Sequence, residues 1–148
     1  MRSTGNHGFS QSSPIPVAGR DIDKSKTYLL DTLGNGSVGQ IREMLIGPGF
    51  HIFCHAPSLI VISASQTGPW AVEDCSLAAE NLMLAAHASG LGTCWIGFAQ
   101  AWLGTAEGKT ALRFGCDDVV PIAPIIVGYP RTQPAPVPRR EPIIHWIG

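Results

Sequence analysis

Three residues that lie close together in the chain, His51, Cys54 and His55, are of types that bind metal ions. Imidazole nitrogens and thiolates are common zinc ligands, and structural zinc sites usually take four of them from two short pairs. No second pair at such a spacing follows, and the next cysteine, Cys75, falls within a predicted helix. Free cysteines are often simply buried as small apolar residues. The sequence therefore favours ordinary core positions, and we expect no metal.

A glycine-rich segment, Gly34-Asn35-Gly36-Ser37-Val38-Gly39, matches the G-x-G-x-x-G pattern of dinucleotide-binding loops. In such loops the glycines let the backbone approach a pyrophosphate between a buried strand and a helix, and an acidic residue about twenty positions later holds a ribose. Here the preceding residues, Tyr28–Leu33, make a poor buried strand, and no Asp or Glu lies about twenty positions later. The match is therefore weak evidence for a nucleotide site.

Side chains for acid–base or nucleophilic catalysis are equally hard to find. Glu73 and Asp74 are adjacent, so they point to different sides of a helix, and both are accounted for by the positive end of the helix dipole. The lone histidines His87 and His145 lie in apolar surroundings, and no Ser, His and Asp set with a nucleophile elbow is present. Nothing in the sequence indicates a covalent hydrolase.

Composition narrows the class of protein. The 148 residues are 45% hydrophobic and 14% charged with a net charge of -1, which suits one domain with a real core. The absence of a Lys/Arg run argues against nucleic acid as a partner, and Met1–Gly19 contains neither a signal peptide nor a membrane span. We therefore expect a cytoplasmic protein that does not bind membranes. For the same reason we expect no disulfides among the four widely spaced cysteines, Cys54, Cys75, Cys94 and Cys116.

The first part of the chain predicts few strong elements. Residues 1–26 are rich in Ser, Gly, Pro and Asn and predict a loop-rich segment, so the single domain is expected to occupy residues 27–148. Thr27–Leu33 and Gln40–Ile46 have roughly helical spacing of apolar residues. Ser58–Ala64 is a continuous β-branched run bounded by turn residues, which is typical of a central strand buried on both faces.

A long helix is predicted from about Trp70 to Ser89, with Pro69 before it and Gly90 placed to end it. From Cys75 onward its only formally charged residue is Glu80, so it is apolar on nearly every side. A helix of this kind must be covered all round, and a small domain offers little protein for that purpose. We therefore expect a second subunit to cover part of it; other segments of the same chain are the alternative.

The remaining elements alternate in type. Leu91–Phe98 contains a short β-like run between glycines, and Ala99–Phe114 is a weak helical region. Pro121 and Pro124 restrict the next apolar stretch, so its strand is expected at Ile125–Gly128. A proline-rich extended segment then precedes a last short strand at Ile143–Ile147. Such an alternation of strands and helices indicates an α/β or α+β fold.

The run Asp74-Cys75-Ser76-Leu77-Ala78-Ala79-Glu80-Asn81-Leu82-Met83-Leu84-Ala85-Ala86-His87-Ala88-Ser89-Gly90-Leu91-Gly92-Thr93-Cys94-Trp95-Ile96-Gly97 resembles the core helix and following strand of the nitroreductase family. Three further segments occur in the family's order: Ala56-Pro57 before an apolar strand, Ile125-Ile126-Val127-Gly128-Tyr129-Pro130, and Pro138-Arg139 before a terminal segment with Trp146. The resemblance covers most of the chain from Phe53 onward.

The resemblance implies an α+β fold, a three-layer sandwich in which helices flank a central, mostly antiparallel sheet and the long core helix lies at a homodimer interface. It also implies FMN at that interface, which passes hydride from NAD(P)H to a small-molecule oxidant such as a nitro compound or quinone. In such enzymes the flavin carries the chemistry and the protein places it. The lack of a catalytic acid or base agrees with this.

Carried over residue by residue, the resemblance implies a cofactor site. The segment expected to lie against the flavin consists of Cys94, Trp95, Ile96 and Gly97, with backbone N–H groups near Ile96 and Gly97 facing flavin N5 and O4. Arg139, aided by Arg140, matches an arginine that binds the FMN phosphate, a role that suits a planar fork of donors. Asn6, in Ser3-Thr4-Gly5-Asn6, matches a flavin-contacting asparagine.

The start of the chain departs from the family's pattern. The family's arginine-rich phosphate-binding segment has no counterpart upstream, and His7-Gly8-Phe9-Ser10 does not continue as the family's Gln-Pro-Trp element. Each missing charge-assisted contact is worth about 1.5 to 3 kcal/mol. The alternative to an NAD(P)H-dependent flavoenzyme is therefore a non-catalytic relative, or a truncated product, that binds FMN weakly or not at all.

Overall fold

A four-stranded antiparallel sheet forms the centre of the protein, with strand order β1-β2-β4-β3. The computed structural model describes residues 15–16, 19–33, 39–65, 68–113, 119–132 and 135–148. The strands are β1 Ile15–Pro16, β2 Ser58–Ala64, β3 Gly92–Trp95 and β4 Val120–Gly128. The helices are α1 Gly19–Leu33, α2 Gly39–Ile46, α3 Ala71–Ala88, α4 Gly97–Leu103 and α5 Ala106–Ala111. The predicted α+β class is confirmed.

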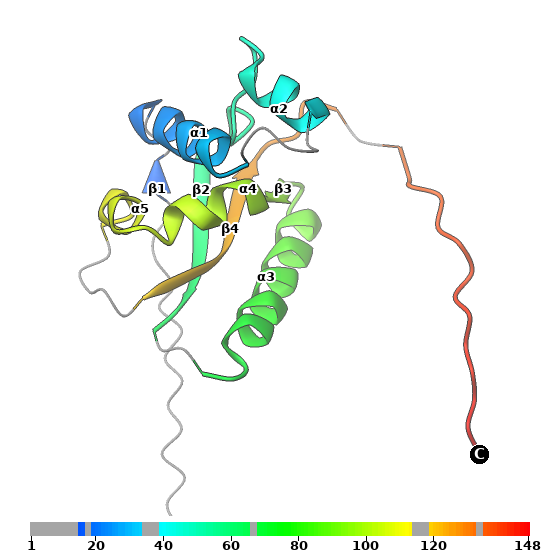
Figure 1. Ribbon diagram of the computed structural model, residues 1–148. Coiled ribbons are helices and arrows are strands. Elements are labelled where there is room, and N and C mark those ends of the chain that lie inside the picture. Colours follow the sequence, from blue (N-terminus) through cyan, green and yellow to red (C-terminus); the bar gives the residue numbers. More distant parts are fainter. Residues whose placement is uncertain (1–14, 17–18, 34–38, 66–67, 114–118, 133–134) are drawn as a thin grey trace, which may run out of the picture.

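The register of the sheet sorts its side chains onto two faces. Leu59, Ile126 and Cys94 are directly paired across β2, β4 and β3, so all three point to one face. The next row, Ile60, Ile125 and Trp95, points to the other. Helix α3 covers this second face, while α4 packs on the first with α1 outside it (Figure 1). The protein is thus a three-layer sandwich of helix, sheet and helix.

Each face has its own apolar cluster. The larger one joins Leu59 and Ile126 to the buried Phe53 of the loop before β2 and to Trp102 and Leu103 of α4. The smaller cluster, on the α3 side, consists of Ala79, Ala123 and Ile125, with Leu82, Met83 and Trp95 packed against it. Small residues at the α3 contact let the helix approach the sheet closely.

Strand β2 has the bounds expected from the sequence, and its interior place between β1 and β4 is confirmed. Its burial alternates, however, with Leu59, Val61 and Ser63 buried and the intervening residues only partly so. The expectation of full burial on both faces was therefore wrong for β2. The strand that is buried along most of its length is β4.

Strand β4 is longer than the predicted Ile125–Gly128 and is central despite its two prolines. Pro121 lies opposite Ser63, where the β2–β4 register shifts, so it falls at an irregularity that interrupts the hydrogen-bond ladder. Pro124 lies beyond the last β3 pair, Trp95↔Ile125, and its carbonyl accepts the Ile96 N–H at 2.8 Å. A proline is compatible with a central strand at such places, because no ladder N–H is lost.

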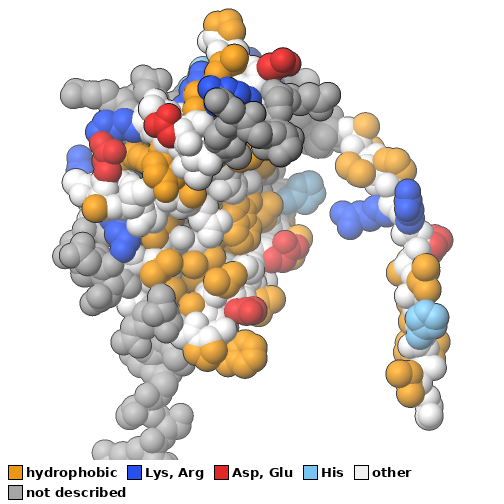
Figure 2. Space-filling view, in the orientation of Figure 1, with side chains coloured by type: hydrophobic (Ala, Val, Ile, Leu, Met, Phe, Trp, Pro, Cys, Tyr) orange, Lys and Arg blue, Asp and Glu red, His pale blue; other side chains and the backbone are white. Residues whose placement is uncertain are grey.

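Helix α3, Ala71–Ala88, confirms the predicted core helix to within one residue at each end. Glu73 and Asp74 lie in its first turn, and Gly90 follows it with φ of 75°. The described residues of one chain leave part of the helix uncovered, so its coverage by a second subunit stays a prediction. Leu77 and Leu84 are 66% and 58% exposed, and Figure 2 shows hydrophobic surface on this side of the molecule.

Three expectations need correction. Helix α1 begins at Gly19, so the segment 1–26 is not loop throughout and the boundary at residue 26 falls inside a helix. The weak helical region 99–114 is two short helices, α4 and α5, separated by Gly104 and Thr105; the Thr105 side chain accepts the Gly108 N–H and caps α5. The last strand, Ile143–Ile147, does not form, because this segment is exposed and no strand of the described residues lies beside it to pair with.

The C-terminal residues instead form an extended tail that leaves the body after β4 (Figure 1). Its described part, residues 135–148, is exposed throughout and includes Ile143, Trp146 and Ile147 at 88%, 89% and 99% exposure. Such apolar residues do not stabilise a lone chain. Among the described residues, no helix combines the length and hydrophobicity that crossing a membrane requires.

Candidate functional site

The end of β3 forms a corner at which the chain leaves the sheet and enters α4. Ile96 is buried at this corner, its N–H donates to the Pro124 carbonyl at 2.8 Å, and its carbonyl accepts the Ala99 N–H at 3.0 Å. Gly97 then opens α4 and is exposed. The Ile96 N–H is therefore committed to the sheet and cannot face a ligand, in contrast to the expectation for this amide.

The Gly97 backbone is the open part of the corner. A Cβ placed on Gly97 would have no neighbour within 4 Å, and no acceptor for its N–H lies among the described residues. Phe98, beside it, is 39% exposed. The corner thus combines an open backbone amide with a partly exposed aromatic side chain, which is a surface that a planar, electron-rich group can approach.

The side chains of Cys94 and Trp95, the last two residues of β3, point away from each other. Trp95 packs against the α3 cluster, whereas Cys94 is exposed on the opposite face. Because successive residues of a strand point to opposite faces, they cannot line one pocket with their side chains. Cys94–Gly97 were expected to bind the flavin together. Their side chains do not line one pocket, so only their backbone atoms can form a common surface at the corner.

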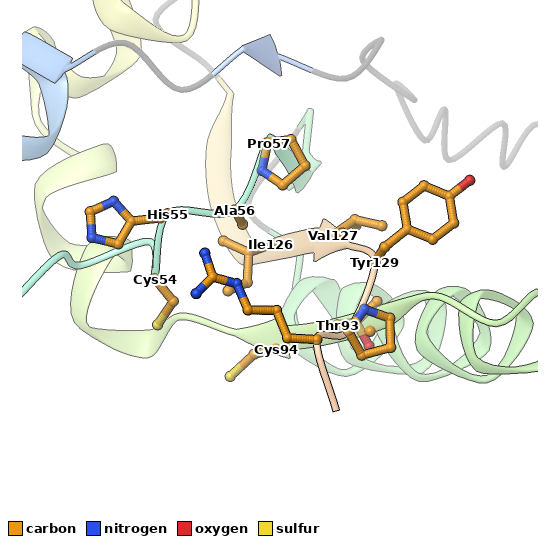
Figure 3. Close-up of a pocket in the computed structure, with 13 residues that line it drawn as sticks. Cys54, His55, Ala56, Pro57, Thr93, Cys94, Ile126, Val127 and Tyr129 are labelled. Carbon is orange, nitrogen blue, oxygen red and sulfur yellow. The ribbon is translucent and has the colours of Figure 1, made fainter. Parts of the chain in front are cut away.

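The Cys94 side chain belongs to a separate hollow, about 480 Å³ in volume, between the loop before β2 and the ends of β3 and β4 (Figure 3). Cys54, His55, Tyr129 and Arg131 also line it. Burial, and secondarily the negative charge that Cys54 can carry, raises the pKa of the Cys94 thiol. Sequence reasoning missed this hollow, because Cys54 and Cys94 are distant in the chain, Cys54 was expected to be a core residue, and Cys94 was expected to lie against a flavin.

The loop that carries Cys54 has an unusual backbone. The backbone of Cys54 and His55 has φ of 51° and 56°, in the left-handed region that residues other than glycine rarely adopt. The loop is held by the Cys54 N–H donating to the His51 carbonyl at 2.8 Å and the His55 N–H donating to His51 Nδ1 at 3.1 Å. The two imidazole rings lie 4.0 Å apart.

The loop with His51, Cys54 and His55 does not place three metal-binding side chains around one point. Within the described part of the chain, no three His, Cys, Asp or Glu side chains gather in a way that could hold a metal ion. Cys75, by contrast, is buried on α3 as expected for a core cysteine. The glycine-rich segment 34–39 follows helix α1 rather than a strand, so the context of a dinucleotide-binding loop is absent.

The residues expected at the phosphate end of the cofactor are not placed at the corner. Arg139 and Arg140 lie on the exposed tail, which Figure 2 shows standing apart from the body. Asn6 lies outside the described residues. Within one chain, therefore, the structure does not bring the predicted phosphate ligand Arg139 to Gly97.

Comparison with known proteins identifies the family. The Nitroreductase family model matches residues 47–129, more than half of the chain, and this range includes the Gly97 corner, Cys54 and Cys94. The chain belongs to the nitroreductase family, as the resemblance implied.

Individual relatives agree with this assignment. A putative NADH dehydrogenase/NAD(P)H nitroreductase of Methanothermobacter thermautotrophicus is 36% identical over 103 residues, which make up 63% of this chain and 53% of that protein. The chain thus spans about half the length of this relative.

Solved structures share the fold. A Bacteroides fragilis nitroreductase with bound FMN has a TM-score of 0.68 over 87% of this chain and 71% of its own. A Desulfitobacterium hafniense nitroreductase with bound FMN has a TM-score of 0.69 over 91% and 74%. Both are 20% identical to this chain, so they establish the α+β nitroreductase fold and not the ligand.

Proposed function

We propose that this chain acts as an FMN-dependent oxidoreductase of the nitroreductase type, which passes hydride from NAD(P)H through FMN to a nitro compound or quinone. The observation that carries the proposal is the Gly97 corner, an open glycine amide within the family-matched range. The FMN named in the two solved structures and the donor named for the archaeal relative support it.

The corner fits the ring end of a flavin. The Gly97 N–H is the donor available to the ring, and the missing Cβ leaves room for a flat group to approach. An N–H directed at the ring would stabilise the negative charge of reduced flavin. Cys94 and Trp95 end the strand β3, and Ile96 joins it to α4, so together these residues hold the Gly97 amide in place. When bound, FMN itself accepts and returns the electrons of the reaction.

To bind the FMN phosphate, Arg139 requires the C-terminal tail to dock on protein rather than extend into solvent. A homodimer provides a surface for such docking. The exposed leucines of α3 and the exposed apolar residues of the tail are surfaces that a second copy would cover. In this arrangement Arg139 would reach an FMN phosphate through the docked tail, with Arg140 beside it. Asn6 would add a contact from the N-terminal segment.

A non-catalytic relative that binds FMN weakly or not at all is the second candidate. One observation favours it: Arg139 lies on the exposed tail, so the corner alone would hold the ring without anchoring the phosphate. The corner would then serve as part of a binding or regulatory module that keeps the family fold.

The two candidates are separated by titrating purified protein with FMN while following flavin absorbance, and by measuring its mass in solution. The enzyme proposal expects one FMN per chain in a dimer, and oxidation of NADH or NADPH with a nitroaromatic or quinone acceptor. A dimer that ignores added FMN would instead support the non-catalytic relative.

The role of Arg139 can be tested in the same titration. Removing one charge-assisted phosphate contact costs about 1.5 to 3 kcal/mol, so Arg139→Ala should weaken FMN binding roughly 10- to 100-fold. Arg139→Lys should lose less, because it keeps the charge but not the planar fork. Equal FMN affinity for the wild type and both variants would remove Arg139 from the site.

A further inference from the structure

We propose that Cys54 and Cys94 form a redox-active dithiol, a modification site that hydrogen peroxide converts to an intramolecular disulfide and that thiol reductants restore. The proposal rests on the placement of two side chains from separate elements beside one hollow (Figure 3). It does not depend on FMN binding.

The sheet register explains why the two cysteines lie close together. Cys94 is paired with Ile126, which is paired with Leu59, so all three share the face that Phe53 covers. Cys54 directly follows Phe53 in the covering loop. Because β3 is the edge strand, Cys94 stands at the open border of this face, where the loop carrying Cys54 crosses it.

Figure 3 shows the Cys54 side chain extending from the loop toward β3, the strand that carries Cys94, while the His55 ring points away from that strand. A disulfide between the two residues requires their Cα atoms to come within about 7 Å and their side chains to rotate toward each other.

Both thiols are accessible to a small oxidant. Cys54 and Cys94 are exposed, whereas Cys75 is only 1% exposed on α3. Helix α3 covers the opposite face of the sheet, so a dimer formed through α3 does not require contact with this hollow. Of the three described cysteines, the two exposed ones are those that share a hollow.

The loop backbone supports a role beyond packing. Two consecutive non-glycine residues with positive φ are unfavourable, and such strain persists only where surrounding contacts fix it. Here the hydrogen bonds from Cys54 and His55 back to His51 fix the turn. The result is that the Cys54 side chain is directed to the hollow.

The chemistry requires one peroxide per pair. We assign the first attack to Cys54, since burial raises the pKa of the Cys94 thiol and disfavours its reactive thiolate form. The Cys54 thiolate attacks one peroxide oxygen, the O–O bond breaks, and a sulfenic acid and water are formed. Cys94 sulfur then attacks the Cys54 sulfur, giving the disulfide and a second water. The two thiols lose two electrons and two protons in total.

Peptide mapping of the full-length protein tests this proposal directly. After treatment with hydrogen peroxide and blocking of free thiols, cleavage after Lys, Arg and Glu separates the described cysteines, because Glu73 lies between Cys54 and Cys75 and Glu80 between Cys75 and Cys94. We expect a linked peptide pair joining residues 44–73 to residues 81–107, lighter than their sum by two hydrogens. Reduction before blocking should abolish it.

Variants provide the controls. Cys54→Ser and Cys94→Ser should each lose the linked pair completely, while Cys75→Ser should retain it. If a variant fails to fold, the map of the wild-type protein decides by itself. Oxidised wild type in which Cys54 and Cys94 are found only as sulfinic acids, in links between chains, or linked to Cys75 or Cys116 would overturn the proposal.

Discussion

Replacing Leu84 by Arg tests whether α3 forms the dimer interface. Leu84 is 58% exposed in the single chain, on the outer side of α3 with Leu77. Substituting an exposed residue seldom changes stability by more than about 0.5 kcal/mol. Leu84→Arg should therefore leave a monomer folded, and any larger effect must come from the assembly.

The size of that effect follows from the exposed fraction. Full burial of a leucine side chain stabilises by about 1.5 to 3 kcal/mol, so covering the exposed part of Leu84 contributes about 1 to 2 kcal/mol per copy. A two-fold interface contains two copies of Leu84, so losing both contributions costs about 2 to 4 kcal/mol of dimer stability. This corresponds to a roughly 30- to 700-fold increase in dimer Kd. Burying an unpaired guanidinium weakens the dimer further.

Sedimentation equilibrium over a range of protein concentrations measures this Kd. Met44→Arg is the matched control, because Met44 is also a half-exposed apolar residue but lies on α2, away from α3. The control should keep the wild-type Kd. A monomeric wild type, or a Leu84→Arg variant with an unchanged dimer Kd, would refute the argument that α3 is covered by a second copy.

Three further predictions concern stability and binding. Gly108→Ala should destabilise the fold by about 3 kcal/mol or more in chemical denaturation, because a Cβ would lie 2.6 Å from Leu103 Cα and collide with the Trp102 carbonyl; a change below 1 kcal/mol would contradict this packing. Gly97→Ala should keep the wild-type Tm within a few degrees but weaken FMN binding at least about tenfold, since its Cβ would stand in open space at the corner. Burial, and then the Asp74 charge, raises the pKa of Cys75. The protonated thiol therefore contributes fully to stability below the ordinary thiol pKa of about 8.5, and this contribution decreases as the pH rises above it. Between pH 7 and 10, the free energy of unfolding should decrease less for Cys75→Ala than for the wild type.

The elements predicted best from the sequence were those with strong local signals. The bounds of α3 follow from Pro69, the acidic first turn and Gly90, and β2 follows from a β-branched run between turn residues. The expected helix 27–33 was the C-terminal half of α1, whose earlier residues lack apolar periodicity. Local patterns thus identified the existence of elements better than their extent.

Features that depend on long-range pairing were predicted less well. The prolines of β4 argued against a central strand, and only the register shown in the structure reveals that Pro121 and Pro124 fall where the ladder is interrupted or ends. Ile143–Ile147 has strand-like residues, yet residue type alone cannot supply a partner strand. Cys54 and Cys94 are neighbours only through the sheet register.

The candidate site was predicted at the level of the segment and not of the atom. The sequence resemblance pointed to Cys94–Gly97, but residue types do not show which amides are used inside the sheet. The structure shows that the Ile96 N–H donates a hydrogen bond within the sheet. The Gly97 N–H has no acceptor among the described residues. The roles of Asn6 and Arg139 stay predictions.

The strand order also determines when the protein can fold during synthesis. Strands β2 and β3 do not pair with each other; both pair with β4, which comes last in sequence among the described strands. A nascent chain therefore cannot complete its sheet until Gly128 has left the ribosome, and until then the apolar faces of β2 and α3 lack their partner. Such late, non-local pairing slows folding and exposes the growing chain to aggregation. Between the synthesis of β3 and the synthesis of β4, the nascent chain therefore carries apolar strand and helix faces that have no partner strand.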